Sequence, residues 1–264
     1  MNNHDLSEIA DIFYRLWIDK SLADSDQRDM SLLSLPQAYD VQQQVIDRCL
    51  SEGEQIAGYK VGCTSSAIRE QFGLAEPICG RLMLPHIFRD DVTLQSSDYA
   101  HCAIEPEFVI CLAVDIANEV VNEAELIDSI AWIAPGIELH RFKFWMGQPT
   151  SQELIASNGI HAGLIVGEPR NSPTDIDLMM EGVGVFRGQQ LVASGIGAEI
   201  MGGPLTSLKW LTNHLLERGQ HLKAGQLVIP GSPVELISVT ANDEIRASFT
   251  RVGSVTSRFT DADR

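Results

Sequence analysis

The chain has 264 residues, of which 44% are hydrophobic and 21% charged, so it is long enough to bury a sizeable core. Its 36 acidic residues against 19 basic ones give a formal charge of −17, which disfavours nucleic acid and anionic membranes as partners. The five cysteines contain no C-x-x-C pair, and no signal peptide or membrane-length apolar run is evident, so a cytoplasmic protein with reduced thiols is expected. Attraction of an anionic substrate would therefore have to be local, through a bound cation or a few Lys and Arg side chains.

The first third of the chain is predicted to be mainly helical. Apolar residues recur at helical spacing over 7–19, which indicates a helix with one buried face. A capping-box pattern at 34–37 predicts the start of a second helix. A short strand that contains Lys60 is expected at 58–62. We treat residues 1–84 as an N-terminal helical portion that includes this strand.

The remaining residues, 85–264, favour many short strands and few helices. Alternation and β-formers predict a strand over 104–114. A second capping-box pattern predicts a helix from Asn122 to about Trp132, ended by Pro135. A further helix is predicted over 204–218. The other strand candidates are 136–140, 161–166, 182–186, 191–194, 226–229, 234–240, 244–250 and 252–259. This pattern predicts an α+β fold with a rolled, barrel-like sheet.

Two carboxylates stand two residues apart in the otherwise apolar run around Pro106. Side chains alternate along a strand, so Glu105 and Glu107 should emerge on one face of it. Two neighbouring anions among apolar residues call for a cation. Glu138 is a third carboxylate in another apolar strand, and three carboxylates suit Mg²⁺ or Mn²⁺. The alternative interpretation is a solvated strand edge.

Three nitrogen-bearing side chains also stand in apolar strands. A desolvated Lys60 could serve as acid, base or electrostatic clamp, whereas the alternative is a lysine that reaches solvent from a strand end. For His140 and His161, each taken alone, the expected role is that of a hydrogen-bonded core histidine.

These residues resemble a known family in their order and spacing. Gly58-Tyr59-Lys60-Val61-Gly62-Cys63-Thr64-Ser65 resembles the G-x-K-x-G-x-T-S segment of the 2-keto-4-pentenoate hydratase and 4-oxalocrotonate decarboxylase family, which has the fumarylacetoacetate hydrolase fold. The further matches are Pro77 with Gly80-Arg81-Leu82, 104–107, 137–138, Asn158, 194–211, 224–226 and 253–259. The resemblance spans nearly the whole chain.

The resemblance implies a metal site, a substrate class and an assembly. It implies Glu105, Glu107 and Glu138 as ligands of a divalent ion, Mg²⁺ or Mn²⁺, and Lys60 as a catalytic residue. It implies small anionic 2-oxo or 2-hydroxy dienoates from meta-cleavage of aromatic rings as substrates. A rolled mixed sheet assembled into a homo-oligomer is implied as well, with a complex with a pathway partner as a further option.

The sequence departs from the family pattern at informative positions. Hydratases commonly carry an Asp where this chain has Ile78, which favours the decarboxylase branch. Arg141 and Ser157 stand where the family often has an Asp. Asn158 keeps the family residue and is expected to be catalytic, and His161 after it is a further catalytic candidate, as proton donor.

Four functions are compatible with this pattern. The leading hypothesis is decarboxylation of a 2-oxo-3-enedioate, with the metal and Lys60 stabilising the dienolate left by CO₂. The alternative is hydration of 2-hydroxypenta-2,4-dienoate through a similar dienolate. A C–C hydrolase acting on an acylpyruvate comes third. A non-catalytic protein that binds a 2-oxo acid or forms part of a complex is the fourth.

Overall fold

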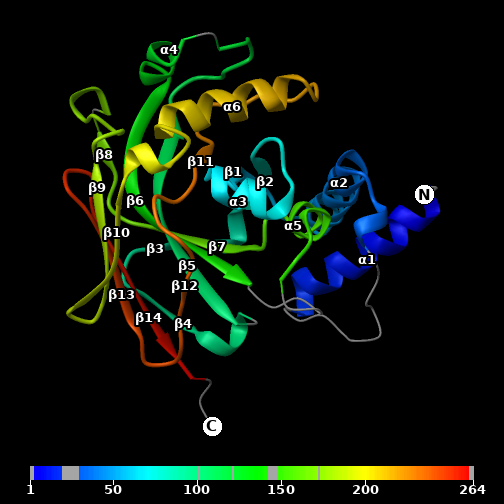
Figure 1. The fold of residues 1–264 in the computed structure, drawn as a ribbon, viewed down its shortest axis with the longest axis horizontal. Helices are drawn as coiled ribbons and strands as arrows, with labels where there is room; N and C mark the ends of the chain where they lie inside the picture. Colours follow the sequence, from blue (N-terminus) through cyan, green and yellow to red (C-terminus); the bar gives the residue numbers. More distant parts are fainter. Residues whose placement is uncertain are drawn as a thin grey trace.

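The structure, a computed structural model, combines a group of helices with two curled β-sheets (Figure 1). It describes residues 3–19, 30–99, 101–120, 122–141, 148–171 and 173–261. The helices α1 (Asn3–Asp19), α2 (Leu35–Ser51) and α5 (Ser151–Ala156) gather at one side of the molecule and share an apolar cluster. Within the described residues, no helix is both long and apolar enough to span a membrane.

Helix α2 begins where the capping-box pattern predicts. The backbone N–H of Ser34 donates to Gln37 Oε1 at 3.0 Å, and the backbone N–H of Gln37 donates back to Ser34 Oγ at 3.4 Å. One side of the helix is buried, with Ala38, Val41, Val45 and Cys49 inside. The predicted second helix is therefore confirmed, and its buried side packs on α1 and α5.

The larger sheet has nine strands and carries the candidate site. Its path runs through β2 (Ile78–Met83), β1 (Ile56–Gly62), β11 (Leu227–Ile229), β5 (Cys102–Leu112), β6 (Ile130–Arg141), β7 (His161–Val166) and β3 (Ile87–Arg89), while β12 (Ile237–Ser238) pairs with β5 and β8 (Arg170–Asn171) with β6. The β1–β11 and β3–β7 pairs are parallel and the other pairs are antiparallel, so the sheet is mixed.

The smaller sheet and the remaining helices complete the fold. In order, the sheet contains β10 (Gln190–Ile196), β9 (Gly182–Arg187), β13 (Glu244–Phe249), β14 (Gly253–Thr260) and β4 (Val92–Gln95). The other α-helices are α3 (Ser66–Phe72), α4 (Ala124–Ile127) and α6 (Pro204–Leu216). Short 3₁₀ turns cover Met30–Leu32, Leu84–His86, Ser96–Asp98, Pro173–Asp175 and Gly197–Glu199.

The main core lies between one face of the larger sheet and the smaller sheet. Phe108 of β5 meets Phe249 of β13 edge to face, with ring centroids 4.9 Å apart. Ile104 and Ile110 are fully buried in the same cluster, on the same face of β5 as Phe108. The opposite face of β5 is therefore the one that carries Glu105 and Glu107.

The helix predicted from Asn122 to Trp132 is wrong. Only α4, at Ala124–Ile127, is helical, and Ile130 already begins β6. From Ile130 to Ile133 three of the four residues are β-formers, and pairing along the whole length of β5 outweighs the local capping signal. Local propensity is a weak guide where a strand has a long partner.

Two prolines lie inside the central strands. Pro106 of β5 falls between the segments that pair with β12, at 103–104, and with β11, at 110–111. Pro135 of β6 falls between residue 136, which pairs with β7, and residue 133, which pairs with β8. Pro106 thus stands in a gap between two neighbours of β5, and Pro135 uses only its carbonyl oxygen on its outer side, where it accepts a hydrogen bond from the backbone N–H of Gly167 at 2.9 Å.

The other expected elements are largely present. The predicted strand 161–166 coincides with β7, and the predicted helix 204–218 is α6. The expectation of α+β architecture is confirmed. The division at residue 84 stays a prediction, and β1 of the N-terminal portion pairs directly with β11.

Candidate functional site

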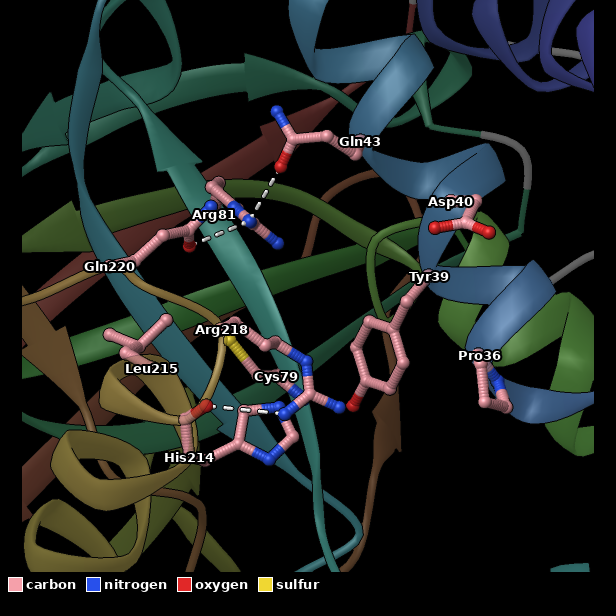
Figure 2. A pocket seen from close by; sticks show the side chains of 10 residues that line it. All are labelled: Pro36, Tyr39, Asp40, Gln43, Cys79, Arg81, His214, Leu215, Arg218 and Gln220. Atoms are coloured by element: carbon pink, nitrogen blue, oxygen red, sulfur yellow. Dashed lines mark hydrogen bonds between the residues drawn. The ribbon is translucent and has the colours of Figure 1, made fainter.

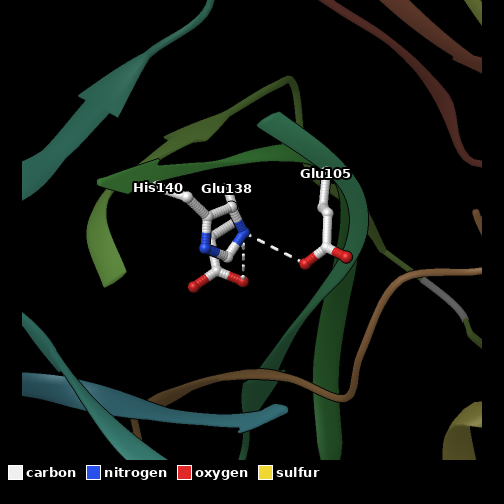
Figure 3. A group of neighbouring side chains, drawn as sticks. All are labelled: Glu105, Glu138 and His140. Carbon is white, nitrogen blue, oxygen red and sulfur yellow. Dashed lines mark ion pairs between the residues drawn. The ribbon is translucent and has the colours of Figure 1, made fainter. Parts of the chain in front are cut away.

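The candidate site is assembled by the register of β5 and β6. Glu105 pairs directly with Glu138, so their side chains leave the sheet on the same face. His140 stands two residues after Glu138 and therefore points to that face as well. Its partner across the strands is Ala103, whose methyl group leaves room for the imidazole ring. Figure 3 shows the three side chains converging.

The imidazole of His140 lies between the two carboxylates. Its Nε2 atom is 3.0 Å from Glu105 Oε2 and 3.4 Å from Glu138 Oε2. Glu138 and His140 are buried, whereas the side chain of Glu105 keeps 22% of its surface exposed. In the described part of the chain, neither ring nitrogen of His140 makes a hydrogen bond. A hydrogen-bonded core histidine, as expected from the sequence, is not what the structure shows.

Lys60 enters the site from β1 and is buried, with 2% of its surface exposed. Its ammonium Nζ lies 2.6 Å from Glu138 Oε1 and donates a hydrogen bond to the carbonyl oxygen of Gly159 at 3.0 Å. The interpretation of Lys60 as a lysine that reaches solvent is therefore wrong.

His161 contacts the same carboxylate oxygen as Lys60. Its Nδ1 atom is 2.7 Å from Glu138 Oε1, and its Nε2 atom has no partner among the described residues. Because a carboxylate only accepts hydrogen bonds, Nδ1 carries the proton in this contact. The two oxygens of Glu138 are thus divided: Oε1 faces Lys60 and His161, and Oε2 faces His140.

The charges in the site stabilise one another. Burial alone would raise the pKa of Glu138, but the charge of His140, Lys60 and the hydrogen bond from His161 together lower it. Burial alone would lower the pKa of Lys60, but Glu138 and then Glu105 raise it. Burial lowers the pKa of His161, so this ring is neutral near pH 7. Lys60 and Glu138 therefore form a buried ion pair.

Glu107 lies on the same face of β5, deeper than Glu105. Its Oε2 atom accepts a hydrogen bond from the backbone N–H of Gly231 at 3.0 Å, and Oε1 has no partner within the described ranges. Burial, Glu138 and Glu105 raise the pKa of Glu107. The described residues bring one set of ligand atoms within 4.8 Å of one another, those of Glu105, Glu138 and His140. Glu107 as a metal ligand stays a prediction.

The residues present fit a divalent cation. Ten buried side-chain polar atoms lack a hydrogen bond in the described structure. Half of them belong to this one site: Glu107 Oε1, Glu138 Oε2, His140 Nδ1, His140 Nε2 and His161 Nε2. Unpaired buried acceptors are costly, and three carboxyl groups here share one ammonium. A bound divalent ion would supply the missing positive charge and the missing partner for the carboxylate oxygens.

Asn158 holds the strand next to Lys60. Its Nδ2 donates to the carbonyl of Arg81 at 2.8 Å, and its Oδ1 accepts from the backbone N–H of Arg81 at 2.7 Å. The residue adopts φ 61°, which asparagine tolerates better than most residues. A Cβ at Gly80 would lie 3.0 Å from both Asn158 Oδ1 and Lys60 Cγ, so only glycine fits between them. Both polar groups of the Asn158 amide are used, which makes it a positioning residue.

Asn158→Ala is expected to lower the free energy of unfolding by about 2–4 kcal/mol, because two buried backbone groups of Arg81 lose their partners. Chemical denaturation monitored by circular dichroism measures this loss. Asn158→Asp should lose at least as much, because it sets a carboxylate oxygen against the carbonyl of Arg81 and buries a charge. An unchanged denaturation midpoint in Asn158→Ala would contradict the positioning role.

The three departures from the family pattern have separate structural roles. Ile78 is buried on the Lys60 face of β2: a Cβ at Gly62 would lie 3.2 Å from Ile78 Cγ1 and 3.7 Å from Lys60 Cε. Arg141 points to the other face, where its guanidinium lies 5.4 Å from the ring of Trp17. Ser157 Oγ accepts from the backbone N–H of Ile160 at 3.3 Å, which shapes the turn before β7. Ile78 alone touches the site.

A pocket of about 250 Å³ lies on the opposite side of β2 (Figure 2). Cys79 and Arg81, which line it, alternate with Gly80 and so face away from Lys60. The guanidinium of Arg81 donates to Gln43 Oε1 at 2.9 Å and to Gln220 Oε1 at 3.2 Å. These contacts hold β2 on the face opposite Lys60. The pocket is separate from the carboxylate site.

Sequence reasoning missed His140 as a member of the site. A usable signal exists, because His140 stands two residues from Glu138 and an alternating strand places both on one face. Helix α5 was missed as well, although Thr150 and Glu153 have capping-box spacing and form that box in the structure.

No family model matches the chain. A 2-keto-4-pentenoate hydratase from Paraburkholderia xenovorans (strain LB400) is 26% identical over 227 residues, which cover 86% of this chain and 84% of that protein. A 4-oxalocrotonate decarboxylase from Pseudomonas putida is 27% identical over 231 residues, which cover 88% of each chain.

Solved structures agree with these relatives. The 4-oxalocrotonate decarboxylase from Pseudomonas putida G7, complexed with magnesium and adipate, is similar with a TM-score of 0.92 at 26% identity, covering 98% of both chains. A fumarylpyruvate hydrolase from Pseudomonas aeruginosa, complexed with Mn²⁺ and pyruvate, has a TM-score of 0.61 at 13% identity over 77% of this chain and 89% of that one. The second likeness shows the fold alone. Together these findings confirm the resemblance and the fold class expected from the sequence.

Proposed function

We propose that this chain, a relative of the 2-keto-4-pentenoate hydratases and 4-oxalocrotonate decarboxylases with the fumarylacetoacetate hydrolase fold, is a divalent-metal-dependent lyase. Its proposed substrates are small 2-oxo or 2-hydroxy dienoate anions, and decarboxylation of a 2-oxo-3-enedioate is the favoured reaction. The observation that carries this proposal is the buried Lys60–Glu138 pair, with further carboxylates beside it and the apolar Ile78 on the Lys60 face of β2. A homo-oligomer is part of the proposal.

The ion, held by Glu105 and Glu138 with Glu107 as a further ligand, would bind the substrate's carboxylate and 2-oxo oxygen and stabilise enolate charge. Lys60 places an ammonium charge beside that oxygen position, and burial increases its effect because water does not screen it. Ile78 supplies apolar surface, which favours loss of a charged carboxylate as CO₂.

His161 is proposed to return the proton that decarboxylation requires. With its Nδ1 proton directed at Glu138, the Nε2 atom has a free lone pair. In the proposed step Nε2, which is buried, takes a proton from a water molecule that enters the site with the substrate and passes it to the dienolate carbon. Glu138 stabilises the imidazolium that forms between these two proton transfers. The ring is therefore protonated only transiently during the reaction.

Incubation with 2-oxo-enedioates, dienoates and acylpyruvates, in Mg²⁺ or Mn²⁺, should release CO₂ from an enedioate. CO₂ is measured separately from water addition and from C–C cleavage. Ile78→Asp should reduce CO₂ release about tenfold or more, because a carboxylate beside the leaving carboxylate adds repulsion and polarity. Ile78→Val is the matched control and should stay close to the parent chain.

Each other outcome selects another function. Efficient hydration of a dienoate with no CO₂ from any enedioate would pass the assignment to a hydratase, which the hydratase relatives support. Cleavage of an acylpyruvate would favour the hydrolase alternative. Binding of 2-oxo acids without turnover would leave the non-catalytic one.

A further inference from the structure

We propose that His140 is a direct ligand of the divalent ion, and that the site therefore prefers a first-row transition metal such as Mn²⁺, Fe²⁺, Co²⁺ or Zn²⁺ to Mg²⁺. The inference rests on the proposed function only in taking a divalent ion as part of the site. The family resemblance implies carboxylates alone as ligands, so the imidazole of His140 adds a nitrogen ligand to that set.

The spacing of the donor atoms supports coordination. Ligands at about 2.1 Å from an ion are about 3.0 Å apart in octahedral geometry and about 3.4 Å apart in tetrahedral geometry. His140 Nε2 lies 3.0 Å from Glu105 Oε2 and 3.4 Å from Glu138 Oε2. One imidazole nitrogen and two carboxylate oxygens lie within 4.8 Å of one another, close enough to bind one ion together.

The simpler role for His140, an imidazolium that neutralises the two carboxylates, fits the contacts less well. A buried imidazolium has two N–H donors and would hydrogen-bond the acceptors beside it. Among the described residues, His140 makes no hydrogen bond from either nitrogen, although Nε2 is at contact distance from two carboxylate oxygens. An imidazole nitrogen at contact distance from two carboxylate oxygens, with a hydrogen bond to neither, is the arrangement expected where a metal ion lies among the three atoms.

His161 has a different role from His140 in this proposal. His161 uses Nδ1 to contact Glu138 Oε1, the oxygen that also contacts Lys60. This contact orients the carboxylate and leaves its Oε2 atom for the ion and His140, as outer partners of metal ligands commonly do. The site thus has one imidazole at the ion and one behind it.

Ligand chemistry then sets the preference among ions. Mg²⁺ takes oxygen ligands in near-ideal octahedra, whereas imidazole suits transition metals such as Fe²⁺ and Zn²⁺, and Mn²⁺ begins the same affinity series. A nitrogen in place of an oxygen therefore weakens Mg²⁺ binding relative to that of a transition metal.

The direct test is electron spin-echo modulation of Mn²⁺ bound to the full-length protein. A coordinated imidazole nitrogen should give a ¹⁴N coupling, and the coupling should disappear in His140→Leu but persist in His161→Leu. By calorimetry, Mn²⁺ should bind at least about tenfold more tightly than Mg²⁺. His140→Leu should lose about tenfold or more in Mn²⁺ affinity and less than about threefold in Mg²⁺ affinity.

Two results would overturn the proposal: no nitrogen coupling in the unsubstituted protein, or a coupling that His161→Leu removes and His140→Leu leaves. The spin-echo measurement on the unsubstituted protein needs no variant. The proposal can therefore be tested even if His140→Leu folds poorly. Failure of the proposed function looks different, because the nitrogen coupling and metal preference would be present while no dienoate or enedioate is turned over with any ion.

Discussion

Glu138→Gln is expected to lower divalent-ion affinity at least about a hundredfold and to abolish measurable turnover. The substitution keeps the shape of the side chain and removes the charge that Lys60, His140 and His161 all contact. Removing one partner of a buried ion pair costs about 3–5 kcal/mol, since the other charge is left uncompensated. Titration calorimetry with Mn²⁺ and Mg²⁺ measures the affinity, and thermal unfolding measures the stability.

Glu181→Gln is the matched control for this experiment. Glu181 is also a buried carboxylate, but it accepts a hydrogen bond from the backbone N–H of Val252 at 2.9 Å and lies outside the site. This control should lose stability and keep its metal affinity. Equal metal affinity in folded Glu138→Gln and in the parent chain would remove Glu138 from the metal site.

Lys60→Met should reduce turnover by about a hundredfold or more, the second largest effect expected. Methionine keeps much of the volume in a buried position and removes the ammonium that is proposed to stabilise the enolate oxygen. The maximal rate should fall more than substrate affinity does, because the charge acts mainly on the transition state. Steady-state kinetics at saturating metal separate the two quantities.

Lys223→Met provides the matched control, because Lys223 is exposed and remote from the site in the fold. Its turnover should equal that of the parent chain. If folded Lys60→Met keeps near-normal turnover, Lys60 is a structural counter-ion of Glu138 and the catalytic role fails.

The fold and the acidic part of the site could be predicted because they depend on short-range periodicity. Alternation alone places Glu105 and Glu107 on one face of β5, and the capping box at Ser34 marks the start of α2. Glu138 was recognisable because it is a single charged residue in an otherwise apolar strand. Family resemblance supplied the chemistry that joins these residues.

What could not be predicted depends on contacts between distant segments. The register that sets Glu105 opposite Glu138, and the division of the Glu138 oxygens between Lys60 and His140, are properties of the folded sheet. Likewise, a helix signal at 122–132 was plausible locally and was overridden by pairing with β5. Lys60 and Gly159 are 99 residues apart in sequence, so no local pattern joins them.

The two prolines in the central strands favour the register that brings the site residues together, although neither proline belongs to the site. Pro106 pairs with Ile137 and Pro135 with Phe108, so both nitrogens turn away from the β5–β6 ladder. A slip of one residue between the strands would turn one of them over, carry its side chains to the other face and aim one proline nitrogen into the ladder. That misaligned hairpin would lose a hydrogen bond as well as the carboxylate pair. We therefore expect the prolines to disfavour this misaligned pairing, in which Glu105 and Glu138 do not lie opposite each other.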